Sequence, residues 1–331
     1  MLVLVLSRTD TESLLDLDAL RDALRPAMED VSSGRASMPA RIAAAVPSGG
    51  LLAAMPAYAP TGGGLMTKLV SLFPGNSGTS LPTHQALVIV FDAESGEPLA
   101  LLDGTSITTL RTAAGSALSA ELLARPDART LAILGTGVQA RAHAEAMMRV
   151  RPIQQIRVAG RNRHRAASLA SALQDTLGVD AQAVDTYQQA CADADLVCAA
   201  THSPVPVVER EFLKPGVNVT SVGYNTDGRE VDSATVADAL VVVESVAAVL
   251  APPPAGCNDL RLPIQEGLIE AGHIHIEIGD LLTGAKAGRI SPDQITLYKS
   301  VGVAAQDAAA ADLVLTAARR QGLGVMIDLS A

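Results

Sequence analysis

The chain has few aromatic residues and little positive charge. Phe, Tyr and Trp together make up 2% of its 331 residues, and Trp is absent. A hydrophobic core must therefore be built from Ala, Val, Leu and Ile, and with 48% hydrophobic residues that core can be large. This composition is typical of a buried parallel sheet covered by Ala-rich helices. The length exceeds that of one compact core and predicts two domains, or one domain with a large insertion.

The formal net charge of −10, with no long basic run, repels phosphate backbones and anionic lipid headgroups. We therefore expect neither nucleic-acid binding nor attachment to a membrane. No stretch reaches the roughly 18 to 20 uncharged apolar residues of a membrane span. Residues 1–6 predict a first strand rather than a signal peptide, because charged residues follow at once. Cys191, Cys198 and Cys257 have no C-x-x-C spacing, which favours reduced thiols in a cytoplasmic protein.

Two patterns divide the chain. Helical spacing predicts a surface helix over residues 13–33, and short β-like runs over 41–103 predict an α+β domain with a mostly antiparallel sheet. After an Ala-rich helix over 107–123, strands and helices alternate, which is typical of parallel βαβ units. The expected strands are 130–134, 155–159, 182–184, 195–200, 218–222 and 239–243, and the helices between them are 138–149, 163–177 and 186–193. Helices near 261–271 and 304–320 return the chain to the first domain.

A dinucleotide-binding motif begins directly after the strand 130–134. It reads Gly135-Thr136-Gly137-Val138-Gln139-Ala140 and opens a helix, which is the context that this motif requires. Gly135 permits the tight turn, and Gly137 lets the backbone approach a pyrophosphate at the helix N-terminus. The sequence therefore predicts a Rossmann cofactor site.

The end of the second strand indicates which dinucleotide binds. A site for NAD places Asp or Glu there, whereas this chain has Arg161, Asn162 and Arg163. Two guanidinium groups suit the 2′-phosphate of NADP(H), because Arg donates charge-assisted, bidentate hydrogen bonds. We therefore expect NADP(H) as the preferred cofactor, with NAD(H) as the alternative.

A series of motifs resembles the ornithine cyclodeaminase/mu-crystallin family over nearly the whole chain. It consists of Lys68-Leu69-Val70, Pro82-Thr83-His84-Gln85-Ala86, Asp103-Gly104, Arg111-Thr112-Ala113-Ala114, residues 135–140, Ser300-Val301-Gly302 and Asp307. The resemblance implies an α/β fold in which a doubly wound parallel Rossmann sheet is inserted into an α+β domain. It implies a substrate-binding and dimerisation domain at 1–118, completed by 303–331, an NADP-binding domain at 119–302, and a homodimer acting on a small molecule.

The resemblance also implies site residues. In the family, two basic residues and the Arg of the R-T-A-A motif hold the substrate carboxylate, and by position these are Arg41, Lys68 and Arg111. Lys68, Arg111 and His84 are the candidate catalytic residues, although His84 equally suits a hydrogen bond within the strand-rich domain. Further candidates are Tyr224, Ser300 and Gly302 for the substrate, and Thr112, Ala200, Thr201, His202, Val222 and Gly223 for the cofactor. We expect no metal site, because His273 and His275 lack a nearby Cys or acidic ligand pattern.

Two positions depart from ornithine cyclodeaminase and favour a reductase. Ala53 and Tyr224 stand where that enzyme has acidic residues, so the carboxylates that handle the ornithine amines are missing. The favoured function is NADPH-dependent reduction of cyclic imine carboxylates, such as Δ1-pyrroline-2-carboxylate or its six-membered homologue. The alternatives are a lyase that recycles NAD(P), as in ornithine cyclodeamination or hydroxyproline dehydration, an alanine dehydrogenase-like enzyme, and a small-molecule binding protein.

Overall fold

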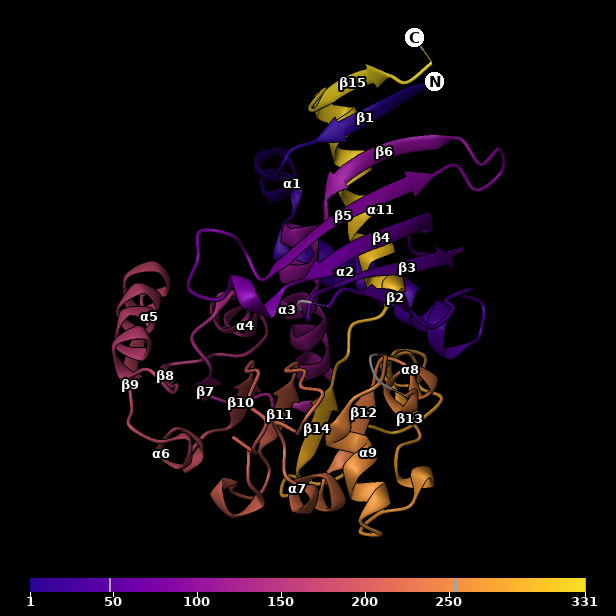
Figure 1. The fold of residues 1–331 in the computed structure, drawn as a ribbon. Helices are drawn as coiled ribbons and strands as arrows, with labels where there is room; N and C mark the ends of the chain where they lie inside the picture. The colour runs from indigo at the N-terminus through magenta and orange to yellow at the C-terminus, as the bar shows by residue number, and fades with distance from the viewer. Residues whose placement is uncertain (48, 253–254, 331) are drawn as a thin grey trace. The chain divides into compact units, whose positions relative to one another are not determined.

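The computed structural model describes residues 1–47, 49–252 and 255–330 as an α/β protein (Figure 1). The chain divides into two compact units, of which the first comprises Met1–Arg111 and Val303–Ala331 and the second Thr112–Gly302. Helix α3 (Gly104–Leu123) begins in the first unit and ends in the second, and the expected boundary at residue 118 lies inside it. In the described part of the chain, no helix is long and apolar enough to cross a membrane.

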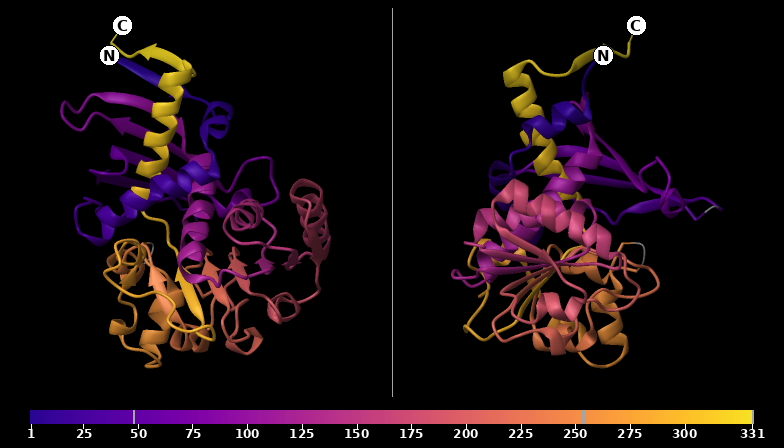
Figure 2. Two further views of the ribbon diagram at one scale, coloured as in Figure 1. Left: turned by 180° about the vertical axis from the view of Figure 1, so that it is seen from behind. Right: turned by 90° about the vertical axis from the view of Figure 1, so that its left-hand side faces the viewer.

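The first unit contains a seven-stranded sheet in which β1 and β6 are parallel and all other neighbours are antiparallel. In sheet order the strands are β15 (Val325–Asp328), β1 (Leu2–Leu6), β6 (Pro98–Asp103), β5 (His84–Phe91), β4 (Gly64–Leu72), β3 (Leu51–Ala59) and β2 (Ile42–Ala45). Because β1 pairs with β15, the two ends of the chain lie side by side (Figures 1 and 2). The predicted mostly antiparallel sheet is confirmed.

Three helices accompany this sheet: α1 (Arg8–Leu14), α2 (Leu17–Ser32) and α11 (Ala304–Gln321), and α11 packs on β3, β4 and α2. The single helix predicted over 13–33 is wrong at its start. Asp16 caps a new helix there, because its Oδ1 accepts hydrogen bonds from the backbone N–H groups of Asp18 and Ala19. A short 3-10 helix, η1 (Pro74–Asn76), lies between β4 and β5.

The second unit contains an eight-stranded sheet with parallel pairing throughout, which confirms the expected βαβ units. In sheet order the strands are β13 (Ile276–Glu277), β12 (Leu240–Val243), β14 (Thr296–Lys299), β11 (Asn218–Ser221), β10 (Leu196–Ala199), β7 (Thr130–Leu134), β8 (Gln155–Ala159) and β9 (Asp180–Ala183). The late strand β14 thus separates β11 from β12, and its carboxyl end lies beside that of β11.

Helices cover both faces of the parallel sheet (Figure 2). They are α4 (Val138–Val150), α5 (Arg163–Leu177), α6 (Tyr187–Cys191), α7 (Ser233–Asp238), α8 (Val246–Leu250), α9 (Asn258–Gln265) and α10 (Ile278–Leu282), with 3-10 helices η2 (Arg210–Phe212) and η3 (Ala271–His273). Ala side chains of α3 and α4 pack with Leu131 and Ile133 on one face, while α6, α7 and α9 pack with Ala132 and Leu134 on the other. The helix predicted over 261–271 is shorter and ends before η3.

Candidate functional site

A buried carboxylate in the first unit holds two of the predicted site residues together. Asp307 lies in the first turn of α11 and has no exposed surface. Its Oδ2 accepts a hydrogen bond from Lys68 Nζ at 2.6 Å, and its Oδ1 accepts one from Arg111 Nε at 3.0 Å. Lys68 comes from the middle of β4 and Arg111 from α3, and both are buried. The structure therefore brings Lys68 and Arg111 to one point.

This Lys68–Asp307–Arg111 cluster has more positive than negative charge. Two cations share one carboxylate, and both also contact neutral groups: Arg111 Nη1 donates to Gln306 Oε1 at 3.0 Å, and Lys68 Nζ donates to Thr108 Oγ1 at 3.4 Å. Burial lowers the pKa of Lys68 to about 8, Asp307 opposes this shift, and the charges of Arg111 and Arg41 add to it. An anion that reaches the cluster would relieve this excess of cations.

The same cations act on His84, which begins β5. Burial and the charges of Lys68 and Arg111 lower the pKa of His84 to about 4. The imidazole is therefore neutral near pH 7, where it can donate or accept a hydrogen bond but holds no extra proton. The four predicted residues Arg41, Lys68, His84 and Arg111 thus influence one another electrostatically within the first unit.

The role of Asp307 was not predicted from the sequence, although Asp307 belongs to the motif series. The available signal was an acidic residue beside a run of four alanines, Ala308–Ala311, all of which are buried. An acid on such a helix face requires a cationic partner, because an unpaired buried carboxylate is costly. The charge of Arg111 foremost, and that of Lys68, keep the pKa of Asp307 low against the effect of its burial.

In the second unit, the predicted glycine turn fits a dinucleotide pyrophosphate. Gly135 has a φ of +122°, and a Cβ there would lie 2.6 Å from the carbonyl oxygen of Ala200. Gly137 caps the 13-residue helix α4 without any side-chain hydrogen bond, and nothing lies within 4 Å of the position of its missing Cβ. The first backbone N–H groups of α4 are thus open to an anion. Nearby, Gln139 Oε1 is buried and without a hydrogen-bond partner.

The predicted cofactor residues Arg161, Asn162 and Arg163 follow β8 and are all exposed. Asn162 Oδ1 accepts a hydrogen bond from the backbone N–H of Arg165 and so caps α5. Arg163 forms an ion pair with Asp185, which follows β9. One of the two predicted guanidinium groups therefore already has a carboxylate partner.

The loops after β10 and β11 carry the other predicted cofactor residues and are tied to each other. His202 Nδ1 lies 3.1 Å from the backbone oxygen of Tyr224, and Asn225 Nδ2 donates to the backbone oxygen of His202 at 2.8 Å. The sequence did not reveal Glu230, a buried acid whose carboxylate accepts hydrogen bonds from Thr201 and Gly223.

A second unpredicted acid, Glu244, fixes the segment after β14. Ser300 Oγ donates to Glu244 Oε1 at 2.5 Å, and the backbone N–H of Gly302 donates to the same oxygen at 3.3 Å. Ser300 is 4% and Thr112 9% exposed, whereas Val138 is 71% exposed at the start of α4. The hydroxyl proton of Ser300 is thus committed to Glu244 rather than to a substrate.

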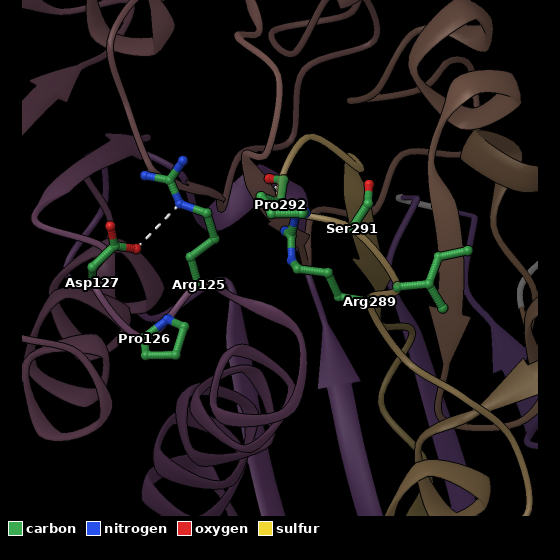
Figure 3. Close-up of a pocket in the computed structure, with 7 residues that line it drawn as sticks. Arg125, Pro126, Asp127, Arg289, Ser291 and Pro292 are labelled. Atoms are coloured by element: carbon green, nitrogen blue, oxygen red, sulfur yellow. Dashed lines mark hydrogen bonds and ion pairs between the residues drawn. The ribbon is translucent and has the colours of Figure 1, made fainter.

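A cavity of about 460 Å³ lies at the amino ends of β7 and β14 (Figure 3). It is lined by Arg125, Pro126, Asp127 and residues 289–292. Apart from Thr112 on α3, the predicted cofactor residues follow β7, β8, β10 and β11 at their carboxyl ends, so this cavity is at the opposite edge of the sheet. Arg125 pairs with Asp127 and Asp195, and Arg289 donates to backbone oxygens, including that of Leu123. The cavity therefore contains none of the predicted site residues.

The fold and these two sets of residues define a class: a Rossmann dinucleotide-binding protein with a buried cationic cluster in its first unit. The chain belongs to the ornithine cyclodeaminase/mu-crystallin family, whose model matches residues 2–322. The predicted resemblance is thereby confirmed.

Relatives of known activity or structure match almost the entire chain. A Δ1-pyrroline-2-carboxylate reductase of Bacillus cereus is 34% identical over 98% of this chain and 100% of its own. The structure of Δ1-pyrroline-2-carboxylate reductase from Thermococcus litoralis, in complex with NADH and L-proline, has a TM-score of 0.93 at 35% identity, covering 98% of this chain and 99% of its own. An archaeal alanine dehydrogenase dimer with bound NAD has a TM-score of 0.92 at 30% identity, covering 99% and 100%.

The low pKa of His84 makes a prediction about stability. Between about pH 4 and 6.5 the unfolded chain binds a proton on this residue that the folded chain does not, so the free energy of unfolding should fall as the pH falls through that window. His84→Gln should show a shallower fall, with a remaining part from buried His143, whose pKa burial also lowers to about 4. Urea unfolding at several pH values measures both slopes, and equal slopes would contradict the assignment.

Proposed function

We propose that the protein is an NADPH-dependent reductase of cyclic imine carboxylates. The substrate is Δ1-pyrroline-2-carboxylate or Δ1-piperideine-2-carboxylate, and the product is L-proline or L-pipecolate. The single observation that carries the proposal is the Lys68–Asp307–Arg111 cluster, where two buried cations meet one carboxylate. An oxidoreductase that acts on carbon–nitrogen bonds with a nicotinamide cofactor is supported by relatives that are reductases or contain bound NAD(H).

The cluster suits the carboxylate of such a substrate. Lys68 and Arg111 already use one donor each on Asp307, which fixes their side chains before the substrate arrives. The substrate carboxylate then adds the second negative charge, so that two anions balance the two buried cations. Arg41, whose charge reaches Lys68, strengthens the attraction.

Reduction of a C=N bond needs a hydride on carbon and a proton on nitrogen. A nicotinamide cofactor, when bound, would supply the hydride. Because the pKa of Lys68 is about 8, its ammonium group is largely protonated near pH 7 yet gives up a proton more readily than an exposed lysine. We propose that Lys68 both orients the carboxylate and provides this proton, and that neutral His84 contributes a hydrogen bond.

The missing acids support a reductase over a lyase. Ala53 is buried in β3 and opposes Val70 of β4, and Tyr224 follows β11, so neither position offers a carboxylate for the amines of ornithine. An alanine dehydrogenase-like activity and a carrier of small molecules remain the competing proposals. Turnover separates them: a reductase consumes NADPH in proportion to product, a lyase forms product without net consumption, and a carrier does neither.

The test follows NADPH absorbance with cyclic imine carboxylates, with keto acids plus ammonia, and with ornithine. We expect turnover of the cyclic imines. In Arg111→Met we expect kcat/KM to fall about 100-fold or more, because the substitution removes the guanidinium group and keeps the apolar part of the side chain. Arg35→Met is the matched control, since Arg35 also pairs with a buried aspartate of the same unit, Asp30. Product formation from ornithine without NADPH consumption would refute the proposal, and equal kcat/KM in both variants would refute the role of Arg111.

The preference for NADPH is part of the proposal and depends on Arg161 and Arg163. Both are exposed beside the turn that follows β8, and the chain has no acid at those positions. Asp185 competes with a 2′-phosphate for Arg163, because the two side chains form an ion pair. The preference for NADPH thus requires that the 2′-phosphate displace the carboxylate of Asp185 from Arg163 or bind Arg163 beside it.

The double substitution Arg161→Gln/Arg163→Gln should raise the KM for NADPH about tenfold or more, since it removes charge-assisted contacts, and leave that for NADH nearly unchanged. Asp185→Asn should act in the opposite direction and tighten NADPH binding. Arg165→Gln, at an exposed position on α5, is the control. Equal affinities of the wild type for NADPH and NADH would overturn the proposed preference.

The homodimer is proposed from one face of the first unit's sheet. Along β4 the side chains of Met66, Lys68 and Val70 are buried, whereas those of the intervening residues are only partly covered. Apolar side chains line this second face in register: Leu69 lies opposite both Leu87 and Ala54. Leu87 is 48% exposed. A sheet that is apolar on both faces suits burial against a second copy, and the alanine dehydrogenase relative is a dimer.

Leu87→Glu should convert the dimer to a monomer, because a carboxylate placed between apolar faces loses its hydration. Leu268→Glu is the control, since Leu268 is 53% exposed in the second unit. Light scattering after size-exclusion chromatography measures the mass of each variant. If Leu87→Glu remains a dimer, the dimer interface does not lie on this face of the sheet.

A cytoplasmic location is also proposed, and three free, buried cysteines support it.

A further inference from the structure

One buried carboxylate in the second unit connects two loops at the carboxyl edge of the parallel sheet. Glu230 is 2% exposed. Its Oε1 accepts a hydrogen bond from the backbone N–H of Thr201 at 2.6 Å, and its Oε2 accepts one from Ser221 Oγ at 2.7 Å and one from the backbone N–H of Gly223 at 2.9 Å. Thr201 follows β10 and Gly223 follows β11, so this single side chain fixes the ends of both strands relative to each other.

The two loops also pack closely around this carboxylate. A Cβ at Gly223 would lie 2.4 Å from Glu230 Oε2 and 2.4 Å from the backbone oxygen of Thr201. The backbone oxygen of Ala200 in turn lies 2.6 Å from the position of a Cβ at Gly135. The loop after β10 is therefore held between the glycine turn on one side and Glu230 on the other. A small displacement of Thr201 changes the space at both neighbours.

Lys299 and Asp259 contact the backbone of Glu230 and the residues that donate to its carboxylate. Lys299 is fully buried, and its Nζ donates to Ser221 Oγ at 3.0 Å and to the backbone oxygen of Gly223 at 2.7 Å. It also forms an ion pair with Asp259 Oδ2 at 3.0 Å. Asp259 Oδ1 accepts the backbone N–H groups of Glu230 and Val231. Burial acts to lower the pKa of Lys299, but the carboxylates of Asp259 foremost and Glu230 outweigh it, so the pKa is raised and the ammonium persists.

We propose that Glu230 is a positioning residue for the nicotinamide end of the cofactor. The inference rests on the proposed function, because the loops that Glu230 holds carry the predicted cofactor residues 200–202 and 222–223 at the sheet edge where ligands bind in this fold. A carboxylate is required there. It supplies acceptors to three donors from two strands, whereas an amide of equal size turns its NH2 group toward an N–H or O–H donor and leaves at least one donor unsatisfied.

The experiment compares Glu230→Gln with Asp195→Asn. Asp195 is a matched control, because it is also a largely buried carboxylate that accepts two backbone N–H groups, those of Arg129 and Thr130, but at the amino end of β7. Both substitutions should lower the melting temperature. In Glu230→Gln we expect the Kd for NADPH, measured by fluorescence titration, to rise about tenfold, and kcat to fall by a similar factor. In Asp195→Asn both constants should stay within about twofold of the wild type.

Two further measurements separate positioning from loss of fold. With NADPH deuterated at the transferred position, the isotope effect on kcat should increase in Glu230→Gln, because a misplaced ring makes hydride transfer slower than the other steps. Ser221→Ala removes one donor to the same carboxylate and should shift the Kd in the same direction by a smaller factor, so the proposal stays testable if Glu230→Gln does not fold.

Unchanged NADPH affinity in Glu230→Gln and Ser221→Ala, with only a lower melting temperature, would overturn the proposal and assign Glu230 a structural role. The affinity measurement needs no imine substrate. If the wild type binds NADPH but reduces none of the imines, the proposed function fails, while the comparison of Kd values still decides the role of Glu230.

Discussion

The contact of Asp307 with Lys68 and Arg111 is the interaction on which the proposed substrate site depends. Two buried cations cost several kcal/mol of desolvation unless an acid meets them. Asp307 meets both, and it is separated from Arg111 by 196 and from Lys68 by 239 positions in the chain. The site therefore requires α11, which follows the whole second unit, to return to strands β3 and β4 of the first unit's sheet. The inserted arrangement of the chain is thus a condition of the site.

In the second unit, buried acids likewise satisfy hydrogen-bond donors, here at the carboxyl edge of the sheet. Glu230 holds the loops after β10 and β11, and Glu244 holds the segment after β14. Glu230 satisfies donors from two chain segments and Glu244 satisfies donors from one, so that these loops acquire fixed positions without forming secondary structure. These loops carry the predicted cofactor and substrate residues. Rigid support of this kind is what a hydride acceptor and donor need, since a misplacement of about 1 Å can slow a reaction about 100-fold.

The predictions from sequence were accurate where the signal was local. Strand 130–134, strand 155–159 and helix 163–177 have the predicted bounds, because hydrophobic periodicity and the residues at their ends act over a few positions. The helix predicted over 13–33 was interrupted by Asp16, since a capping hydrogen bond begins a new helix there. The resemblance of the motifs identified the family and the residues Lys68 and Arg111. It did not identify Asp185 as the partner of Arg163, because ion pairs on a surface have no sequence period.

The sequence by itself determined the class of the protein: a parallel Rossmann sheet, a glycine turn that opens α4, and cations suited to a carboxylate. These follow from residue types at short spacings, which act through backbone geometry and local charge. Only the tertiary structure decided which acid pairs with which cation, that Lys299 is buried against Asp259, and that Glu230 connects two strands. The physical reason is that a buried charge is stable only beside its partner, and that partner comes from wherever the packed chain places it.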